Sequence, residues 1–207
     1  MNNIVIHPTY FPSISHFVAM LQSEKILFEV EDNFQKQTNR NRMYIYSANG
    51  IQMLNIPIKH SNELHQKFKD VVIEDAFGWQ KQHFKSLEAA YRTSPYFEFF
   101  EDDLRPLFEE KQKYMLDLNF KIHEVITSCL GIELPFEKTI EFHKDYSHTD
   151  ILDLRALANG KKDVNEFEPY TQVFEEKEGF INNLSILDLL FNEGRHAIDY
   201  LKTQSLK

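Results

Sequence analysis

Near its N-terminus the chain carries the stretch on which the fold depends, Asn3-Ile4-Val5-Ile6-His7-Pro8-Thr9-Tyr10-Phe11-Pro12. The first half of this stretch is apolar and β-branched, which favours a short buried strand over residues 3–7. Pro8 ends the strand because proline has no backbone N–H to donate. Ser13 is a candidate helix cap, and apolar residues follow it at helical spacing: Ile14, Phe17, Met20 and Leu21. The chain therefore opens with a strand, a loop held between two prolines, and a helix.

Further strands are expected where β-branched and apolar residues cluster. These segments are residues 26–31, 71–73 and 138–143. The clearest pattern is a hairpin in which residues 43–46 and 51–58 flank Asn49-Gly50. Asn-Gly is the pair that supplies the positive φ angles of a tight type I′ turn.

Helical periodicity dominates the remainder of the chain. We expect helices over residues 78–92, 116–130, 186–192 and 196–201, a partly helical segment over 96–110 and a short helix over 152–158. Strands and helices interleave, which predicts an α/β or α+β fold. The expected architecture is a small mixed sheet that includes the Asn-Gly hairpin, surrounded by helices, with a helix-rich C-terminal half. We expect one domain over residues 1–207.

Composition narrows the class of protein further. The 207 residues carry 23 Lys and Arg against 32 Asp and Glu, a formal net charge of −9. This acidic balance argues against broad nucleic-acid binding. No apolar run approaches the ~18 residues of a membrane span, and the N-terminus lacks the features of a signal peptide. Cys129 is the single cysteine and lies on an apolar helix stripe, so we expect a buried, inert thiol in a cytoplasmic protein.

Four segments, taken in order, resemble the WbqC-like protein family of bacterial polysaccharide and O-antigen gene sets. The first is Ile6–Pro12, where His7 stands at a position that is usually Gln in the family. The second is Asp32–Arg42, which ends in Asn39-Arg40-Asn41-Arg42. The third combines residues 54–58, 79–83 and 91–95, and the fourth combines residues 170–174, 179–180 and 183–194. The match is specific because the four segments are co-linear over nearly the whole chain.

The resemblance implies a transferase. The role suggested for the family is transfer of an amino acid, notably glycine, onto the amino group of a sugar carried on a nucleotide or a lipid. This chain is therefore expected to be an N-acyltransferase of bacterial surface polysaccharide synthesis, with aminoacyl-tRNA or an adenylate as the alternative donors. A non-catalytic protein of the same pathway, which binds a sugar nucleotide or a partner enzyme, is the other interpretation. The expected substrate is a small anionic molecule, and no cofactor is expected.

Several residues are candidates for binding that substrate. Arg40 and Arg42 carry guanidinium groups that match phosphate or carboxylate bidentately. Tyr10 can stack on a base or a sugar, and the N–H groups of the helix that begins at Ser13 offer an anion site. Amide side chains read both donors and acceptors, which makes the following residues candidates for positioning the substrate: Asn39, Asn183 and Asn192.

Acyl transfer to an amine also needs a group that accepts a proton, and His83 and His7 are the candidate catalytic residues. The pattern also allows His83 to be a core histidine on an apolar helix face, and it favours binding over base catalysis for His7. Ser185 and Asp188 match a capping box, a structural motif at a helix start. A metal site is not expected, because the histidine pairs His60/His65 and His143/His148 are five residues apart and no cysteine pair exists.

Overall fold

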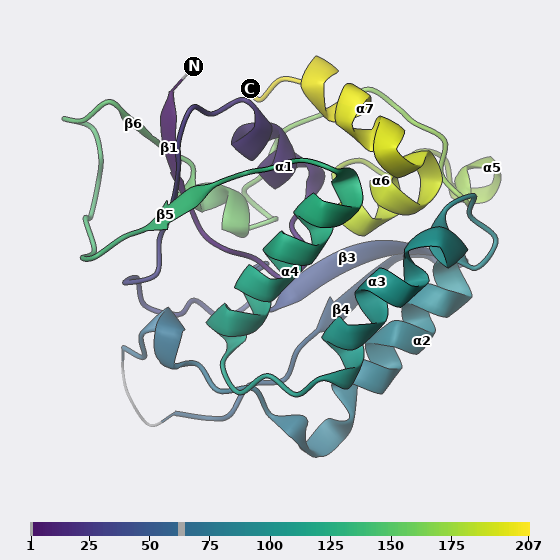
Figure 1. Ribbon diagram of the computed structural model, residues 1–207, viewed down its shortest axis with the longest axis horizontal. Coiled ribbons are helices and arrows are strands. Elements are labelled where there is room, and N and C mark those ends of the chain that lie inside the picture. Colours follow the sequence, from purple (N-terminus) through teal and green to yellow (C-terminus); the bar gives the residue numbers. More distant parts are fainter. Residues whose placement is uncertain (1, 62–64) are drawn as a thin grey trace.

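The computed structural model describes residues 2–61 and 65–207, and a small parallel sheet forms one side of it (Figure 1). Four strands pair in the order β5-β2-β1-β6: β1 (Asn3–Ile6), β2 (Ile26–Phe28), β5 (Phe136–Lys138) and β6 (Ile151–Asp153). Helix α1 (Ile14–Leu21) carries the chain from β1 to β2, whereas β6 pairs with the opposite side of β1. The strand order therefore reverses beside β1, and such a switch point is where open α/β sheets bind ligands.

The predicted hairpin is present as a second, antiparallel sheet of β3 (Arg42–Ser47) and β4 (Gly50–Asn55). Its turn differs from the prediction by one residue. Ser47 pairs with Gly50, so Ala48 and Asn49 form the two-residue turn, and Gly50 takes the left-handed conformation at φ 88°. Asn49 is not among the residues with positive φ in the described part of the chain. The predicted type I′ turn at Asn49-Gly50 is therefore wrong, while the hairpin itself is confirmed.

Helices surround the two sheets (Figure 1). The longer ones are α2 (Trp79–Tyr91), α3 (Phe97–Glu109), α4 (Met115–Leu130), α6 (Ile186–Glu193) and α7 (Ala197–Thr203). The short ones are α5 (Glu175–Glu178) and the 3-10 turns η1 (Phe68–Asp70), η2 (Asp75–Phe77), η3 (Arg155–Ala158) and η4 (Gly194–His196). Gly131 ends α4 at φ 71°, as the sequence indicates. The mixed α/β class is confirmed, and no helix in the described ranges is long and apolar enough to cross a membrane.

Three of the expected elements differ from the structure. Residues 71–73 form isolated bridges to Ile58 and Tyr114 rather than a strand. The strand expected at 138–143 is instead β5, which ends at Lys138. The helix expected at 152–158 is the parallel strand β6 followed by η3. Strands of three residues carry too little periodicity to be recognised without their partners, which explains these errors.

The predicted capping box is only half correct. Ser185 Oγ accepts from the backbone N–H of Leu187 at 3.3 Å and caps α6. Asp188 does not reach back to this cap; it is fully buried and accepts from the hydroxyls of Tyr91 at 2.8 Å and Tyr170 at 2.5 Å, and from Gln172 Nε2 at 2.9 Å. Burial raises the pKa of Asp188. A carboxyl group thus joins α2, α6 and the segment at 170–172 through the interior.

We expect Tyr91→Phe to lower the free energy of unfolding by about 1–3 kcal/mol. The Tyr91 hydroxyl donates to Asp188 and also accepts from the backbone N–H of Tyr46 at 3.0 Å, so its loss leaves two buried groups without this partner. Urea denaturation measures the change. Tyr44→Phe is the matched control, because the Tyr44 hydroxyl has no hydrogen-bond partner among the described residues. Equal stability of the two variants would contradict this role for Tyr91.

Candidate functional site

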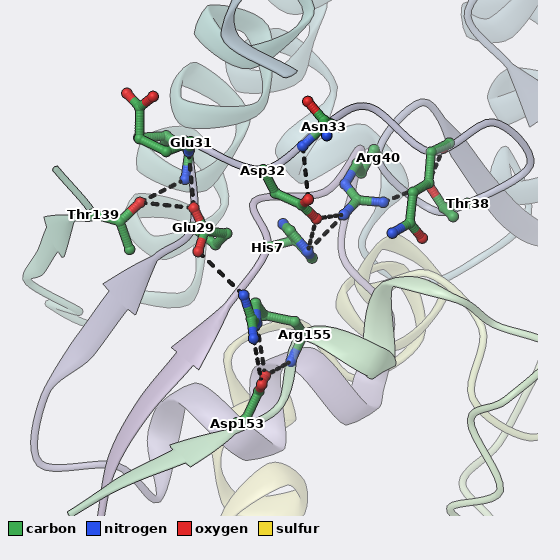
Figure 2. Close-up of polar contacts among 12 residues, drawn as sticks. His7, Glu29, Glu31, Asp32, Asn33, Thr38, Arg40, Thr139, Asp153 and Arg155 are labelled. Carbon is green, nitrogen blue, oxygen red and sulfur yellow. Dashed lines mark hydrogen bonds and ion pairs between the residues drawn. The ribbon is translucent and has the colours of Figure 1, made fainter. Parts of the chain in front are cut away.

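The carboxyl ends of the four parallel strands meet at one edge of the sheet and carry a concentration of polar side chains (Figure 2). His7 follows β1, Glu29 follows β2, Thr139 follows β5, and Arg155 follows β6. A cleft of about 430 Å³ opens here, which we call the sheet-edge cleft. It is lined by His7, Asp32, Gln35, Thr38, Arg40, Phe142, Lys144, Asp153, Arg155, Ala156, Ala158, Asn159 and Lys162.

Arg40 is the central group of this edge, and only 1 % of it is exposed. Its Nη2 lies 2.6 Å from His7 Nε2 and 2.9 Å from Asp32 Oδ2, so its two hydrogens serve both partners (Figure 2). An arginine cannot accept a hydrogen bond, so His7 Nε2 is the acceptor and the imidazole is neutral with its proton on Nδ1. Burial lowers the pKa of His7 to about 4, which agrees with this tautomer. A glutamine Oε1 could accept the same hydrogen, so the position does not depend on an imidazole.

A second network ties the remaining strand ends together (Figure 2). Glu29 is fully buried, and its Oε1 accepts from Thr139 Oγ1 at 2.9 Å and from the Glu31 backbone N–H at 2.8 Å. Its Oε2 lies 3.4 Å from Arg155 Nη1, while Arg155 Nη2 donates to Asp153 Oδ2 at 2.6 Å. Each of these carboxylates is therefore occupied by donors from the protein itself.

Lys144 and Lys162 also line the sheet-edge cleft. Among residues 2–61 and 65–207, neither ammonium group has an ion-pair partner, whereas Asp32 and Asp153 pair with arginines. The cleft therefore presents two uncompensated positive charges over a rigid base. Such an arrangement suits an anionic ligand despite the acidic balance of the whole chain.

A second cavity of about 340 Å³ brings together Asn39, Arg42 and Asn183 with Phe11 of the opening loop. We call it the amide pocket; its other lining residues are Ser13, Met43, Tyr44, Ile51, Gly160, Lys161, Asp163, Asn182, Leu184 and Ser185. Three of the predicted binding residues thus meet from segments far apart in the sequence. Arg40 does not join them, because it lines the sheet-edge cleft instead.

Two segments contribute residues both to the sheet-edge cleft and to the amide pocket. In the segment 38–42, Thr38 and Arg40 face the cleft, whereas Asn39 and Arg42 line the pocket. In the loop 159–163, Asn159 and Lys162 line the cleft, and the other three residues line the pocket. The two cavities are therefore neighbours that border the same two segments.

Asp163 holds the wall of the amide pocket in place. Its Oδ2 accepts from Ser15 Oγ and from Asn183 Nδ2, the latter at 2.7 Å, and its Oδ1 accepts from Asn165 Nδ2 at 2.7 Å. Ser13 Oγ, which lines the pocket, lies 3.0 Å from Ser15 Oγ. A continuous hydrogen-bonded path therefore connects the pocket surface at Ser13 with the Asp163 carboxylate.

The N-terminus of α1 is not an open anion site, which corrects the expectation for this helix. The backbone N–H of Ile14 donates to the Leu184 carbonyl at 3.1 Å, and that of Ser15 donates to Asn183 Oδ1 at 3.0 Å. Ser13 Oγ also lies 3.1 Å from His16 Nδ1 instead of capping the helix. The segment at 183–184 thus occupies the donors that an anion would need.

The remaining predicted residues lie outside both cavities. His83 and Tyr10 are buried partners, with 2.8 Å between His83 Nδ1 and the Tyr10 hydroxyl, and burial lowers the pKa of His83 to about 4. Asn192 donates to the Asp188 carbonyl at 2.7 Å within α6. None of the three lines the cleft or the pocket. These contacts are structural, and they do not favour His83 as a base.

Sequence reasoning missed Asp32, Asp153, Arg155 and Asp163. Position in the sheet could have indicated three of them, because Asp32 follows β2, Asp153 ends β6 and Arg155 follows β6. The sequence pattern does not identify β6 as a strand, however. No group of three metal-ligating side chains occurs in the part of the chain that the structure describes. Cys129 is buried, and burial raises the pKa of its thiol to about 11.

Residues 7–166 match the sequence pattern of the WbqC-like protein family. The chain belongs to this family. All residues that line the sheet-edge cleft fall inside the matched range, whereas Asn182 and Asn183 of the amide pocket lie beyond it. A relative from Mycobacterium tuberculosis (strain ATCC 25618 / H37Rv), named uncharacterized protein Rv1507c, is 25 % identical over 226 residues, which cover 96 % of each chain. No solved structure matches the chain described here.

We expect the free energy of unfolding of His7→Gln to lie within about 1 kcal/mol of the wild-type value, and that of His7→Leu to be about 1–3 kcal/mol lower. Glutamine retains an acceptor for Arg40 Nη2, whereas leucine leaves this buried guanidinium hydrogen without its partner. Urea denaturation at neutral pH measures both variants. A glutamine variant as unstable as the leucine variant would show that the acceptor is not what His7 contributes.

Stability is expected to fall as the pH drops from about 6.5 to about 4. Burial lowers the pKa of three histidines to about 4, namely His7, His16 and His83, so the unfolded chain binds more protons in this window. Each histidine contributes a slope of up to about 1.4 kcal/mol per pH unit. The raised pKa of Asp188 acts in the opposite direction.

The contribution of one histidine can be isolated with His83→Gln. In urea denaturation across this pH range, this variant should reduce the slope of unfolding free energy against pH by the equivalent of up to one proton. His148→Gln is the control, since this side chain is exposed and has no polar partner among the described residues. The interpretation fails if both variants retain the slope of the wild type.

Proposed function

We propose that this WbqC-like protein is an N-acyltransferase that joins an amino acid to the amino group of a sugar in surface polysaccharide synthesis. The observation that carries the proposal is a pair of neighbouring cavities that border the same two segments, 38–42 and 159–163. A transfer between two substrates needs two adjacent binding sites, each matched to one reactant. The family to which the chain belongs supplies the polysaccharide context, and a cytoplasmic location agrees with a nucleotide-linked substrate.

The sheet-edge cleft is assigned to the activated acyl donor. Both donor alternatives, an adenylate and an aminoacyl-tRNA end, carry phosphate next to the acyl group. Lys144 and Lys162 supply positive charge that no carboxylate in the described chain neutralises, and Arg155 lies with them. The buried Arg40 and His7 form the base of this cleft and hold its shape. In this proposal they support binding of the donor and take no part in proton transfer.

The amide pocket is assigned to the amino sugar. Asn39 and Asn183 offer amide groups to sugar hydroxyls, and Arg42 supplies positive charge beside them. The pocket also contains the Asp163 carboxylate, which has no ion-pair partner among the residues that the structure describes. A fixed negative charge of this kind attracts the ammonium form of the amino sugar.

The path from Ser13 to Asp163 provides for the proton that the amine must lose. The bound ammonium first passes one proton to Ser13 Oγ, while the Ser13 proton passes to Ser15 Oγ and the Ser15 proton passes to Asp163, which frees the lone pair of the amine. The amine then attacks the acyl carbon and the C–N bond forms. The leaving group of the donor departs with the electrons of its bond to the acyl carbon and takes up the second proton of the nitrogen. His16 Nδ1 donates to Ser13 in this arrangement and keeps the hydroxyl oriented.

A non-catalytic role in binding a sugar nucleotide is the second candidate. It is favoured by the two histidines predicted as bases, because burial lowers the pKa of both to about 4 and each ring is already hydrogen-bonded. Under this alternative the same cavities bind their ligands without turnover.

Incubation with an amino-sugar nucleotide and glycyl-adenylate or glycyl-tRNA tests the proposal, with the amide product measured by mass spectrometry. We expect the wild type to form the amide and Asp163→Asn to lose about 100-fold or more in rate, because the final proton acceptor is gone. Asp150→Asn is the control for the same chemical change at an exposed site outside both cavities. Absence of product with either donor would favour the binding role.

A further inference from the structure

A third cavity, of about 440 Å³, lies beside the amide pocket and shares Arg42 with it. It lies where the segment 34–42 meets the end of β4 and the residues that follow it. The side chains that matter here are Phe34, Lys36, Asn41, Arg42, Lys59 and His60. We call this space the basic cavity.

The charge of this cavity contrasts with that of the whole chain. Lys36, Arg42 and Lys59 are positive, and the described residues that line the cavity include no aspartate or glutamate. The chain as a whole carries a formal net charge of −9. Local charge of the opposite sign in an acidic protein indicates a surface that receives an anion.

Among the residues that the structure describes, these positive groups also have no counter-charges. Within the described ranges, the ammonium groups of Lys36 and Lys59 have no ion-pair partner, and Arg42 Nε donates to the neutral Asn55 Oδ1 at 3.2 Å. Arg40, two residues away, is instead paired with Asp32. Because like charges in a confined space repel one another, three such groups with no acid among the described lining residues suit an external anion.

Two further groups suit the rest of a nucleotide. Asn41 is buried; its Nδ2 donates to Asn55 Oδ1 at 3.1 Å and to the Ile56 carbonyl at 2.9 Å, while its Oδ1 is buried without a hydrogen-bond partner. An unused acceptor requires a donor such as a hydroxyl or an N–H group. Phe34, which is half-buried and packs against Phe68, adds an aromatic ring to the cavity wall that can stack with a planar base.

We propose that the basic cavity binds the diphosphate of a nucleotide-linked sugar, with the nucleoside beside Phe34 and the sugar in the amide pocket. Arg42 lines both cavities, so its guanidinium spans the junction between phosphate and sugar. This inference rests on the proposed function for the assignment of the sugar. It adds the choice of carrier, a nucleotide rather than a lipid, and the residues that recognise it.

Isothermal titration of the full chain with uridine diphosphate tests the assignment. We expect measurable binding that weakens with added salt, competition by inorganic pyrophosphate, and no measurable binding of uridine, because the phosphates supply the attraction. The double variant Lys36→Ala/Lys59→Ala should bind uridine diphosphate at least 10-fold more weakly. The control Lys85→Ala/Lys202→Ala removes the same charge from exposed helical positions that have no ion-pair partner in the described chain.

Several results would overturn the inference. They include no binding of uridine diphosphate by the wild type at millimolar concentration, equal weakening by both double variants, and uridine binding as tightly as the diphosphate. A short single-stranded RNA that binds more tightly than uridine diphosphate through the same lysines would also overturn it, since it would assign the cavity to the donor nucleic acid.

The outcome is separable from that of the acyl-transfer experiment. Lysine-dependent binding of uridine diphosphate without amide formation supports the basic cavity and contradicts catalysis. Amide formation on an amino sugar that lacks a nucleotide, unaffected by the lysine double variant, supports catalysis and contradicts the nucleotide assignment.

Discussion

The buried guanidinium of Arg40 is the interaction on which the candidate site depends. A charge removed from water is stable only when donors and acceptors around it are matched, and here Asp32 and His7 supply the acceptors. The same contacts join the end of β1 to the segment 32–42, which then leads directly into β3. Because this segment is anchored by Arg40, Asn39 and Arg42 are held at the amide pocket.

This division of one segment between two cavities explains why two neighbouring arginines have different roles. Arg40 is buried and paired, so it serves mainly as a fixed part of the cleft. Arg42 is paired with no carboxylate in the described chain and borders both the amide pocket and the basic cavity, so its charge is available to a ligand. The two arginines are only two residues apart in the sequence, but Arg40 lines the sheet-edge cleft, whereas Arg42 lines the amide pocket and the basic cavity.

Histidine illustrates how the interior changes the chemistry of a side chain. His7 and His83 are the sequence candidates for acid–base chemistry, yet burial keeps both of them, and also His16, neutral near pH 7. His7 accepts from a cation, and His83 accepts from the Tyr10 hydroxyl. Asp163 differs because it is anchored by neutral donors at a pocket wall, which leaves its negative charge uncompensated within the described chain.

Local periodicity and co-linear motifs are enough to predict the mixed class, the first strand, the hairpin, the main helices and the family. The sequence also predicts Asn39, Arg42 and Asn183 as binding residues, and the structure brings them into one pocket. By contrast, only the folded chain shows that β6 is a strand, that Asp188 belongs to a buried network, and that His83 and Tyr10 pair in the core. The reason is that a three-residue strand, a buried carboxylate and a histidine pair are all defined by partners distant in sequence, and local pattern carries no information about those partners.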